Sequence, residues 1–230
     1  MPFTLLSLMP WAAALTGALA IAGNLLGLPA LILVCKPATT LAIIAWAWPR
    51  GADVPATRRW VRAGLVLSLA GDVFLIWPQG FLPGLVSFLL AHLAYIVAFT
   101  RTLRLAARPL PFAVYGLVAA ALLWQLWPGV PAPLRLPVLA YVVCLASMAA
   151  QAALVWLAAR GNAEAALARR AALGGVLFMT SDTLLAFDKF ASPLPLASLW
   201  ILATYWVAQG LIAGSLRGRA NPRLPPSSRR

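Results

Sequence analysis

Charged residues are scarce in this sequence. They make up 10% of its 230 residues, whereas a typical soluble domain carries roughly 25%. Hydrophobic residues account for 63% of the chain, and the mean hydropathy is +0.89. Because so few charged groups can face water, the composition excludes a soluble domain and predicts an all-α, polytopic membrane protein.

Residues that commonly bind metals or nucleotides are also scarce. The chain has one histidine and two cysteines, Cys35 and Cys144, whereas a zinc site needs at least about three good ligands. Both cysteines lie in apolar stretches, where cysteine acts as a small hydrophobic residue, so a disulfide framework is not indicated. Gly-rich phosphate loops and the G-x-S-x-G pattern of a nucleophile elbow are absent. We therefore expect no metal and no organic cofactor.

Arginine is the one abundant charged residue, and its distribution indicates topology. The formal net charge is +13, but the arginines lie singly or in short clusters between apolar stretches. This pattern does not form a basic face, so we expect no nucleic-acid partner. Of the 16 arginines, 15 fall in alternate connections between apolar stretches, and only Arg135 falls on the other side. The positive-inside rule then predicts that both termini are cytoplasmic.

Eight apolar stretches approach the roughly 20 residues that a helix needs to cross a membrane. Pro10 is expected to interrupt the first stretch early. Together the stretches predict a single eight-helix transmembrane bundle over residues 1–216, followed by a basic, disordered cytoplasmic tail at residues 217–230. The predicted helices cover residues 8–26, 28–48, 60–78, 81–100, 110–127, 134–158, 167–188 and 194–216.

Four ionisable residues lie inside these predicted helices at a similar depth. At about 1.5 Å per residue from the non-cytoplasmic helix ends, Lys36, Asp72 and Asp182 lie roughly 9 to 12 Å deep, and His92 lies at about 16 Å. An ionisable side chain inside a membrane is costly and is usually retained for function. Four such groups on four helices at one level predict a shared buried site.

The two aspartates are residues of this site that can exchange protons in a reaction. Two carboxyl groups in a low-dielectric pocket can take different protonation states, so one can act as a general acid and the other as a general base. This pair suits the acid-catalysed addition of water to a lipid. Our hypothesis assigns catalysis to Asp72, Asp182 and His92, and leaves open which aspartate is the acid. The residues assigned to substrate binding are Lys36, Tyr95, Lys189, Tyr205, Gln209 and Asn24.

Several short motifs resemble those of a known family, the YhhN-type lysoplasmalogenases. They are Lys36-Pro37-Ala38-Thr39-Thr40, Gly71-Asp72-Val73-Phe74-Leu75, Ala91-His92-Leu93-Ala94-Tyr95, Ser181-Asp182-Thr183-Leu184-Leu185-Ala186 with Lys189-Phe190, and Tyr205 with Ala208-Gln209. The resemblance covers nearly the whole chain, and the order and spacing of the motifs make it specific. Asp188 departs from the pattern, because an uncharged polar residue is expected there, and we give it no role.

The resemblance implies an eight-helix membrane hydrolase without a cofactor. Such an enzyme cleaves the vinyl ether bond of a lysoplasmalogen, a lysophospholipid, into a fatty aldehyde and glycerophosphocholine or glycerophosphoethanolamine. In this interpretation one aspartate protonates the vinyl group, and the other stabilises the resulting cation and activates water. Lys36 contacts the polar end of the substrate, while His92 and Tyr95 orient water or the head group. The expected location is a bacterial inner membrane.

A transporter is the main alternative to the enzyme. Membrane-embedded Asp, Lys and His residues also form pathways for protons and ions, so the same cluster could drive proton- or ion-coupled transport of a small molecule. An inverted repeat would favour transport, but the sequences around Asp72 and Asp182 are not otherwise similar. A purely structural membrane protein would not need four ionisable groups at one depth.

Overall fold

The computed structural model describes residues 3–218, and over this range the fold consists of eight α-helices and three short 3-10 helices without a strand. The α-helices are α1 (Phe3–Leu25), α2 (Pro29–Ala47), α3 (Pro55–Phe74), α4 (Phe81–Thr100), α5 (Pro109–Leu126), α6 (Arg135–Ala159), α7 (Ala165–Phe190) and α8 (Ala197–Gly214). The 3-10 helices are Pro78–Gly80, Trp127–Gly129 and Ala132–Leu134. The predicted all-α class and the eight predicted helices are confirmed.

The predicted bounds of two helices, α1 and α3, need correction. Helix α1 begins at Phe3 rather than near residue 8, and Pro10 lies inside it without ending it. A proline removes one backbone hydrogen bond, which a long membrane helix tolerates. Helix α3 begins earlier than expected, at Pro55, because a proline fits the first helical turn. It ends at Phe74, before the predicted end near residue 78.

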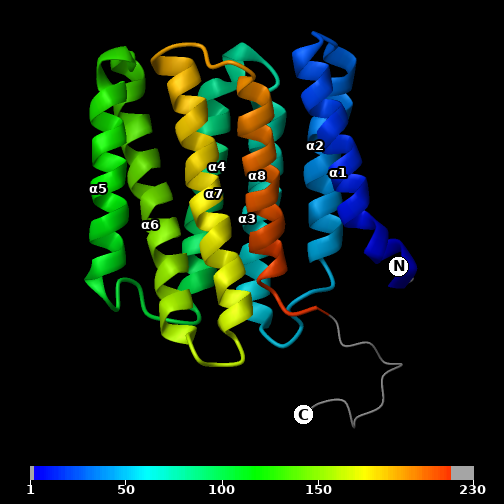
Figure 1. Cartoon of the computed structure of the whole chain (residues 1–230), viewed down its shortest axis with the longest axis vertical. Coiled ribbons are helices and arrows are strands. Elements are labelled where there is room, and N and C mark those ends of the chain that lie inside the picture. The colour runs from blue at the N-terminus through cyan, green and yellow to red at the C-terminus, as the bar shows by residue number, and fades with distance from the viewer. Residues whose placement is uncertain (1–2, 219–230) are drawn as a thin grey trace.

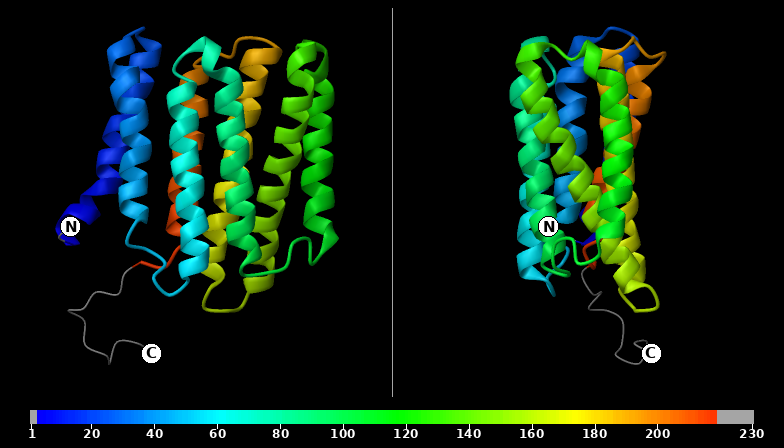
Figure 2. Two further views of the ribbon diagram at one scale, coloured as in Figure 1. Left: turned by 180° about the vertical axis from the view of Figure 1, so that it is seen from behind. Right: turned by 90° about the vertical axis from the view of Figure 1, so that its left-hand side faces the viewer.

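Seven of the helices in the described range are long and apolar enough to cross a membrane, so the protein is a polytopic membrane protein. Helix α3 is not among these seven. It has the length of a span, but it carries Arg58, Arg59 and Arg62 near its start and Asp72 near its end. Its low hydropathy therefore comes from a basic end and a buried carboxyl group, while α3 itself packs along α4 within the bundle (Figure 2).

The helices run side by side in one bundle (Figure 1). Helices α1 and α2 form one edge, α5 and α6 form the opposite edge, and α3, α4, α7 and α8 lie between them. Sequential neighbours pack together in the pairs α1 with α2, α3 with α4, and α7 with α8. Both described ends of the chain lie at the same end of the bundle (Figure 1), as an even number of crossings requires.

Gly64 and Gly71 allow α3 to lie very close to α4. A Cβ atom added at Gly64 would lie 2.2 Å from Cε1 of Tyr95, and one added at Gly71 would lie 2.5 Å from Cε2 of Phe88. Aromatic rings of α4 therefore occupy the space that a larger residue on α3 would need, as small residues permit at membrane helix interfaces. Asp72 follows Gly71 directly, so this close packing also helps to bury its carboxyl group.

Residues 215–218, which follow α8, contact the loops at the end of the bundle where both described chain ends lie. Arg217 forms ion pairs with Glu164 and Asp53, and its carbonyl oxygen accepts a 2.9 Å hydrogen bond from the Gly51 N–H. The first residue of the predicted tail is thus held by the loops that precede α3 and α7. The rest of that tail, residues 219–230, lies outside the described residues.

Candidate active site

A polar cavity of about 850 Å³ opens between the helices. It extends to residues of the α3–α4 and α7–α8 connections, at the end of the bundle opposite the two described chain ends (Figure 1). Five helices contribute polar side chains to it. These are Asn24 of α1, Lys36 of α2, Asp72 of α3, Ser181, Asp182, Asp188 and Lys189 of α7, and Ser198 and Tyr205 of α8. The structure therefore brings together Lys36 and both predicted catalytic aspartates, which lie up to 146 residues apart in the sequence.

Asp72 is held by two hydroxyl groups from neighbouring helices. Thr40 of α2 donates a 2.6 Å hydrogen bond to its Oδ2 atom, and Tyr205 of α8 donates a second bond of 2.8 Å to the same atom. The Asp72 side chain is almost fully buried. Lys36 lines the same cavity and interacts electrostatically with Asp72, but within residues 3–218 the two side chains do not form a direct ion pair. The second oxygen of Asp72 accepts no side-chain bond in this range, so it is available to a ligand or to water.

A second layer of hydrogen bonds supports these donors. The Tyr95 hydroxyl donates to Oε1 of Gln209 at 2.6 Å, and Nε2 of Gln209 donates to the Tyr205 hydroxyl at 3.3 Å. Trp206 donates from Nε1 to the Thr40 hydroxyl at 3.2 Å. Tyr95 and Gln209 are therefore placed behind Tyr205 and do not line the cavity. The geometry indicates that they position Tyr205, although the sequence had assigned them to substrate binding.

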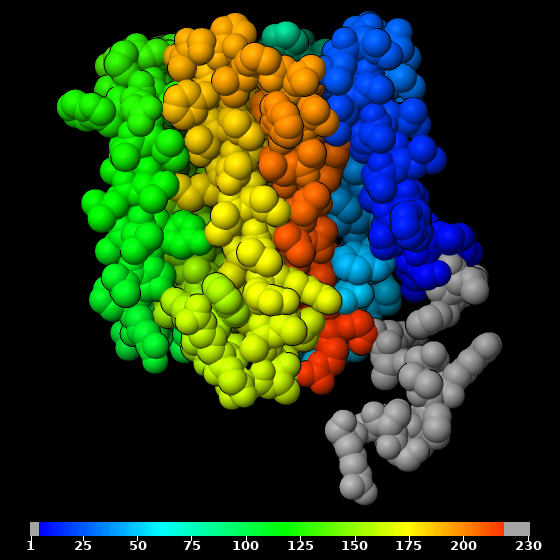
Figure 3. All heavy atoms as spheres, viewed as in Figure 1, coloured from blue at the N-terminus to red at the C-terminus, as the bar shows by residue number. Residues whose placement is uncertain are grey.

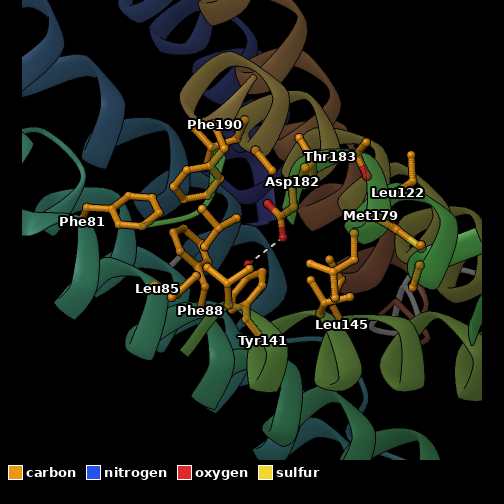
Figure 4. Close-up of a pocket in the computed structure, with 18 of the residues that line it drawn as sticks. Phe81, Leu85, Phe88, Leu122, Tyr141, Leu145, Met179, Asp182, Thr183 and Phe190 are labelled. Atoms are coloured by element: carbon orange, nitrogen blue, oxygen red, sulfur yellow. Dashed lines mark hydrogen bonds between the residues drawn. The ribbon is translucent and has the colours of Figure 1, made fainter. Parts of the chain in front are cut away.

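Asp182 lines both the polar cavity and a second, apolar cavity. Figure 4 shows Asp182 among the residues of the apolar cavity. Its Oδ2 atom accepts a 2.6 Å hydrogen bond from the hydroxyl of Tyr141 on α6. The apolar cavity measures about 90 Å³, and leucine, valine, alanine and phenylalanine side chains form most of its wall. The two cavities share Leu75, Phe81, Phe88, Asp182 and Leu185 in their walls. Asp182 is the only ionisable side chain in the described range that borders both.

His92 is not placed in either cavity. Its side chain is 0% exposed, and its ring packs edge-on against Phe178 at 4.6 Å and Tyr141 at 5.2 Å between ring centroids. Neither ring nitrogen has a hydrogen-bond partner within residues 3–218. The depth along α4 agrees with that of the site, but the side chain lies behind Tyr141, so any effect on Asp182 would act through that tyrosine.

Three further polar residues lie at the rim of the polar cavity. The Lys189 ammonium lies 4.2 Å from the centroid of the Phe81 ring, a cation–π contact. Asp188 accepts a 2.8 Å hydrogen bond from the Leu194 N–H and so holds the α7–α8 connection. Asn24 donates from Nδ2 to the carbonyl oxygen of Ala20 at 2.9 Å, which leaves its side-chain oxygen free to face the cavity.

Sequence reasoning missed Thr40, Tyr141 and Trp206. Thr40 belongs to the Lys36-to-Thr40 motif, but only its contact with Asp72 gives it a role. Tyr141 could have been predicted from the sequence. The chain has four tyrosines, and a tyrosine in the middle of a predicted helix can donate a hydrogen bond to a carboxylate inside the bundle. Within the described part of the chain, no three His, Cys, Asp or Glu side chains are grouped so that they could hold a metal ion.

Fold and site define the chain as a polytopic helical membrane protein with two carboxyl groups at a polar cavity between its helices, Asp72 buried and Asp182 partly buried. Residues 31–216 match the model of the YhhN family, so the chain belongs to this family. The matched range contains every predicted site residue except Asn24. No solved structure matches the chain.

The curated relatives include mammalian and bacterial proteins. Pig lysoplasmalogenase TMEM86B is 36% identical over 201 residues, which cover 84% of this chain and 76% of the relative. Human lysoplasmalogenase TMEM86B is 36% identical over 185 residues, covering 80% of this chain and 73% of the relative. The lysoplasmalogenase of Mycobacterium bovis is 33% identical over 194 residues, covering 80% of this chain and 69% of the relative.

Proposed function

We propose that this protein is a membrane-embedded lysoplasmalogenase. It hydrolyses the vinyl ether bond of a lysoplasmalogen to a fatty aldehyde and glycerophosphocholine or glycerophosphoethanolamine. Membership of the YhhN family supports this activity. The structural observation that carries the proposal is the position of Asp182 at the boundary between a polar and an apolar cavity.

The two cavities match the two ends of such a substrate. A lysoplasmalogen has a phosphate-bearing head group on one side of its vinyl ether and an aliphatic chain on the other. The polar cavity holds Lys36 and Lys189, whose ammonium groups suit a phosphate. The apolar cavity suits the carbons of the chain that follow the double bond. The vinyl ether then lies at the boundary, beside Asp182.

Asp182 acts as the general acid in this arrangement. The carbon that receives the proton is the vinyl carbon on the chain side, and Asp182 is the carboxyl group that reaches the apolar cavity. Proton transfer to this carbon leaves an oxocarbenium ion at the carbon bonded to the ether oxygen. The carboxylates then stabilise the positive charge, and the hydrogen bond from Tyr141 fixes the orientation of Asp182.

Asp72 acts as the general base. It faces the polar cavity, which is large enough to hold water, and it has one oxygen that is not engaged by Thr40 or Tyr205. Asp72 takes a proton from water as the water oxygen adds to the oxocarbenium carbon. The resulting hemiacetal loses its hydroxyl proton, the glycerol oxygen leaves with a proton, and a fatty aldehyde remains.

The proposed topology has eight crossings with both termini in the cytoplasm. The arginine-bearing connections α2–α3, α4–α5 and α6–α7 lie at the same end of the bundle as both described chain ends (Figure 1). The positive-inside rule assigns this end to the cytoplasm. Reporter fusions after Trp48 and after Trp77 are expected to report opposite sides, and equal signals from both would contradict this topology.

Aldehyde release from purified protein tests the enzymatic proposal. Protein in detergent or nanodiscs is incubated with lysoplasmalogen and, as a matched control, with its saturated ether analogue. Aldehyde is expected only from the vinyl ether, because the saturated ether has no double bond to protonate. In deuterated water, the aldehyde should carry one deuterium on the carbon next to its carbonyl. A transporter would release no aldehyde from either lipid, and that result would refute the proposal.

A further inference from the structure

The apolar cavity is too small for the whole aliphatic chain of a lysolipid. It measures about 90 Å³, and for comparison an engineered apolar cavity of about 150 Å³ holds one benzene molecule. Only the few carbons next to the vinyl group can therefore fit beside Asp182. The remaining carbons need a route out of this cavity.

A groove between α5 and α7 adjoins the apolar cavity. It measures about 450 Å³ and shares Leu122, Met179 and Thr183 with the cavity wall. These three side chains lie on the side of Asp182 away from Phe81 and Leu85 (Figure 4). The outer part of the groove is lined by further residues of both helices, including Val118, Val176 and Leu184. Val118 is 48% exposed and Val176 is 42% exposed, so the groove reaches the bilayer-facing surface.

The packing of α5 explains why an opening occurs here. Helix α5 packs along α6 but makes only slight contact with α7. Figure 3 views the face of the molecule that carries both α5 and α7. A second groove, between α5 and α6, also adjoins the apolar cavity through Ala119, Leu123 and Val142, but it measures only about 210 Å³. It also lies between two helices that are packed together, so it is the less favourable route.

We propose that the aliphatic chain of the substrate passes out of the apolar cavity between α5 and α7, with its distal carbons in the bilayer. This inference rests on the proposed function. The groove is then the lateral route by which a membrane lysolipid reaches Asp182 and by which the fatty aldehyde returns to the bilayer. Because the distal carbons contact lipid, the enzyme should discriminate only weakly among long chains.

Photolabelling of the unaltered protein tests the route directly. The probe is a saturated ether lysolipid with a diazirine in the middle of its chain, which binds but cannot be hydrolysed. Labelled peptides are expected from residues 114–122 of α5 and 176–184 of α7, and excess unlabelled lysolipid should suppress the labelling. Labelling confined to residues 139–147 of α6, or to α1 and α2, would overturn the proposal.

Tryptophan substitutions test the route kinetically. Val118→Trp and Leu184→Trp fill the outer groove without touching the apolar cavity. Each should lower kcat/KM about tenfold or more for a hexadecenyl substrate, with a much smaller loss for a butenyl analogue that fits inside the cavity. Leu117→Trp and Leu173→Trp are matched controls on the same two helices, because both residues are exposed on the surface and line no described cavity. Val143→Trp blocks the α5–α6 groove and should have no chain-length-dependent effect.

The outcomes separate this proposal from the proposed function. If the unaltered protein releases no aldehyde from any vinyl ether, the proposed function is wrong, whatever the labelling shows. If it is active but Val143→Trp shows the selective loss for long chains, the route between α5 and α7 is wrong. The same conclusion follows if Val118→Trp and Leu184→Trp turn over the hexadecenyl substrate normally. Photolabelling uses the unaltered protein, so it still tests the route between α5 and α7 if a tryptophan variant does not fold.

Discussion

Asp72 on α3 and Asp182 on α7 line the same cavity, but their hydrogen-bond partners and neighbours differ. Asp72 accepts bonds from Thr40 and Tyr205 and interacts electrostatically with Lys36. Asp182 accepts one bond, from Tyr141, and borders an apolar cavity. Two identical side chains are thus placed in unlike surroundings, which is the arrangement that lets paired carboxyl groups divide acid and base roles.

Replacing either aspartate by asparagine should have the largest effect. Asp72→Asn and Asp182→Asn keep the size of the side chain but remove its ability to exchange a proton. Each should lower the rate of aldehyde release by about a hundredfold or more, with little change in thermal stability. Asp53→Asn is the matched control, because Asp53 lies at the opposite end of the bundle and pairs with Arg217. Near-normal turnover in both site variants would contradict the two-carboxylate mechanism.

Removing the hydroxyl donors should give the next largest effect. Tyr141→Phe and Tyr205→Phe each delete one hydrogen bond to an aspartate. Hydrogen bonds to a carboxylate, which Asp72 is as the base and Asp182 becomes on giving up its proton, are worth roughly 1.5–3 kcal/mol. We expect kcat to fall by about tenfold or more in each variant. Tyr95→Phe makes the same chemical change one step further from Asp72, so its effect should be smaller. An equal loss in all three variants would indicate a general structural defect.

The two lysines should differ in their contribution to substrate binding. Lys36 is buried beside Asp72, whereas Lys189 already contacts the Phe81 ring at the rim. Lys36→Met is expected to raise KM by about tenfold, because a buried ammonium group loses its contact with the phosphate. Lys189→Met should raise KM less. Steady-state kinetics with a vinyl ether lysolipid measure both values, and a larger effect of Lys189→Met would reverse the proposed order of the two contacts.

His92 should give the smallest effect on activity. It is fully buried against Phe178 and Tyr141, and its two ring nitrogens have no partner in the described range. Replacing an unpaired buried polar group by an apolar one of similar shape is nearly neutral or stabilising. His92→Phe should therefore leave kcat within a few-fold of normal and keep or raise the melting temperature. A loss as large as that of Asp182→Asn would restore the catalytic role predicted from the sequence.

Residues of α3 and α4 show how far sequence reasoning could go. The depth of Asp72 and His92 along their helices follows from counting residues, and both lie at the level of the site. The direction of each side chain around its helix does not follow from the count, because it depends on how the helices pack. Close contacts at Gly64 and Gly71 set the packing of α3 on α4. In the packed bundle, Asp72 faces the polar cavity, whereas His92 faces Phe178.

The sequence by itself determined the class, the number of helices, and the burial of Lys36 and Asp72. The physical reason is local: a membrane helix satisfies its backbone hydrogen bonds internally, and a charged side chain within it must avoid lipid. Only the tertiary structure decided that Tyr141 reaches Asp182, that Thr40 and Tyr205 reach Asp72, and that Asp182 separates a polar from an apolar cavity. These contacts join helices that are distant in the chain, so their rotation and spacing come from side-chain packing between helices, which no single stretch of sequence contains.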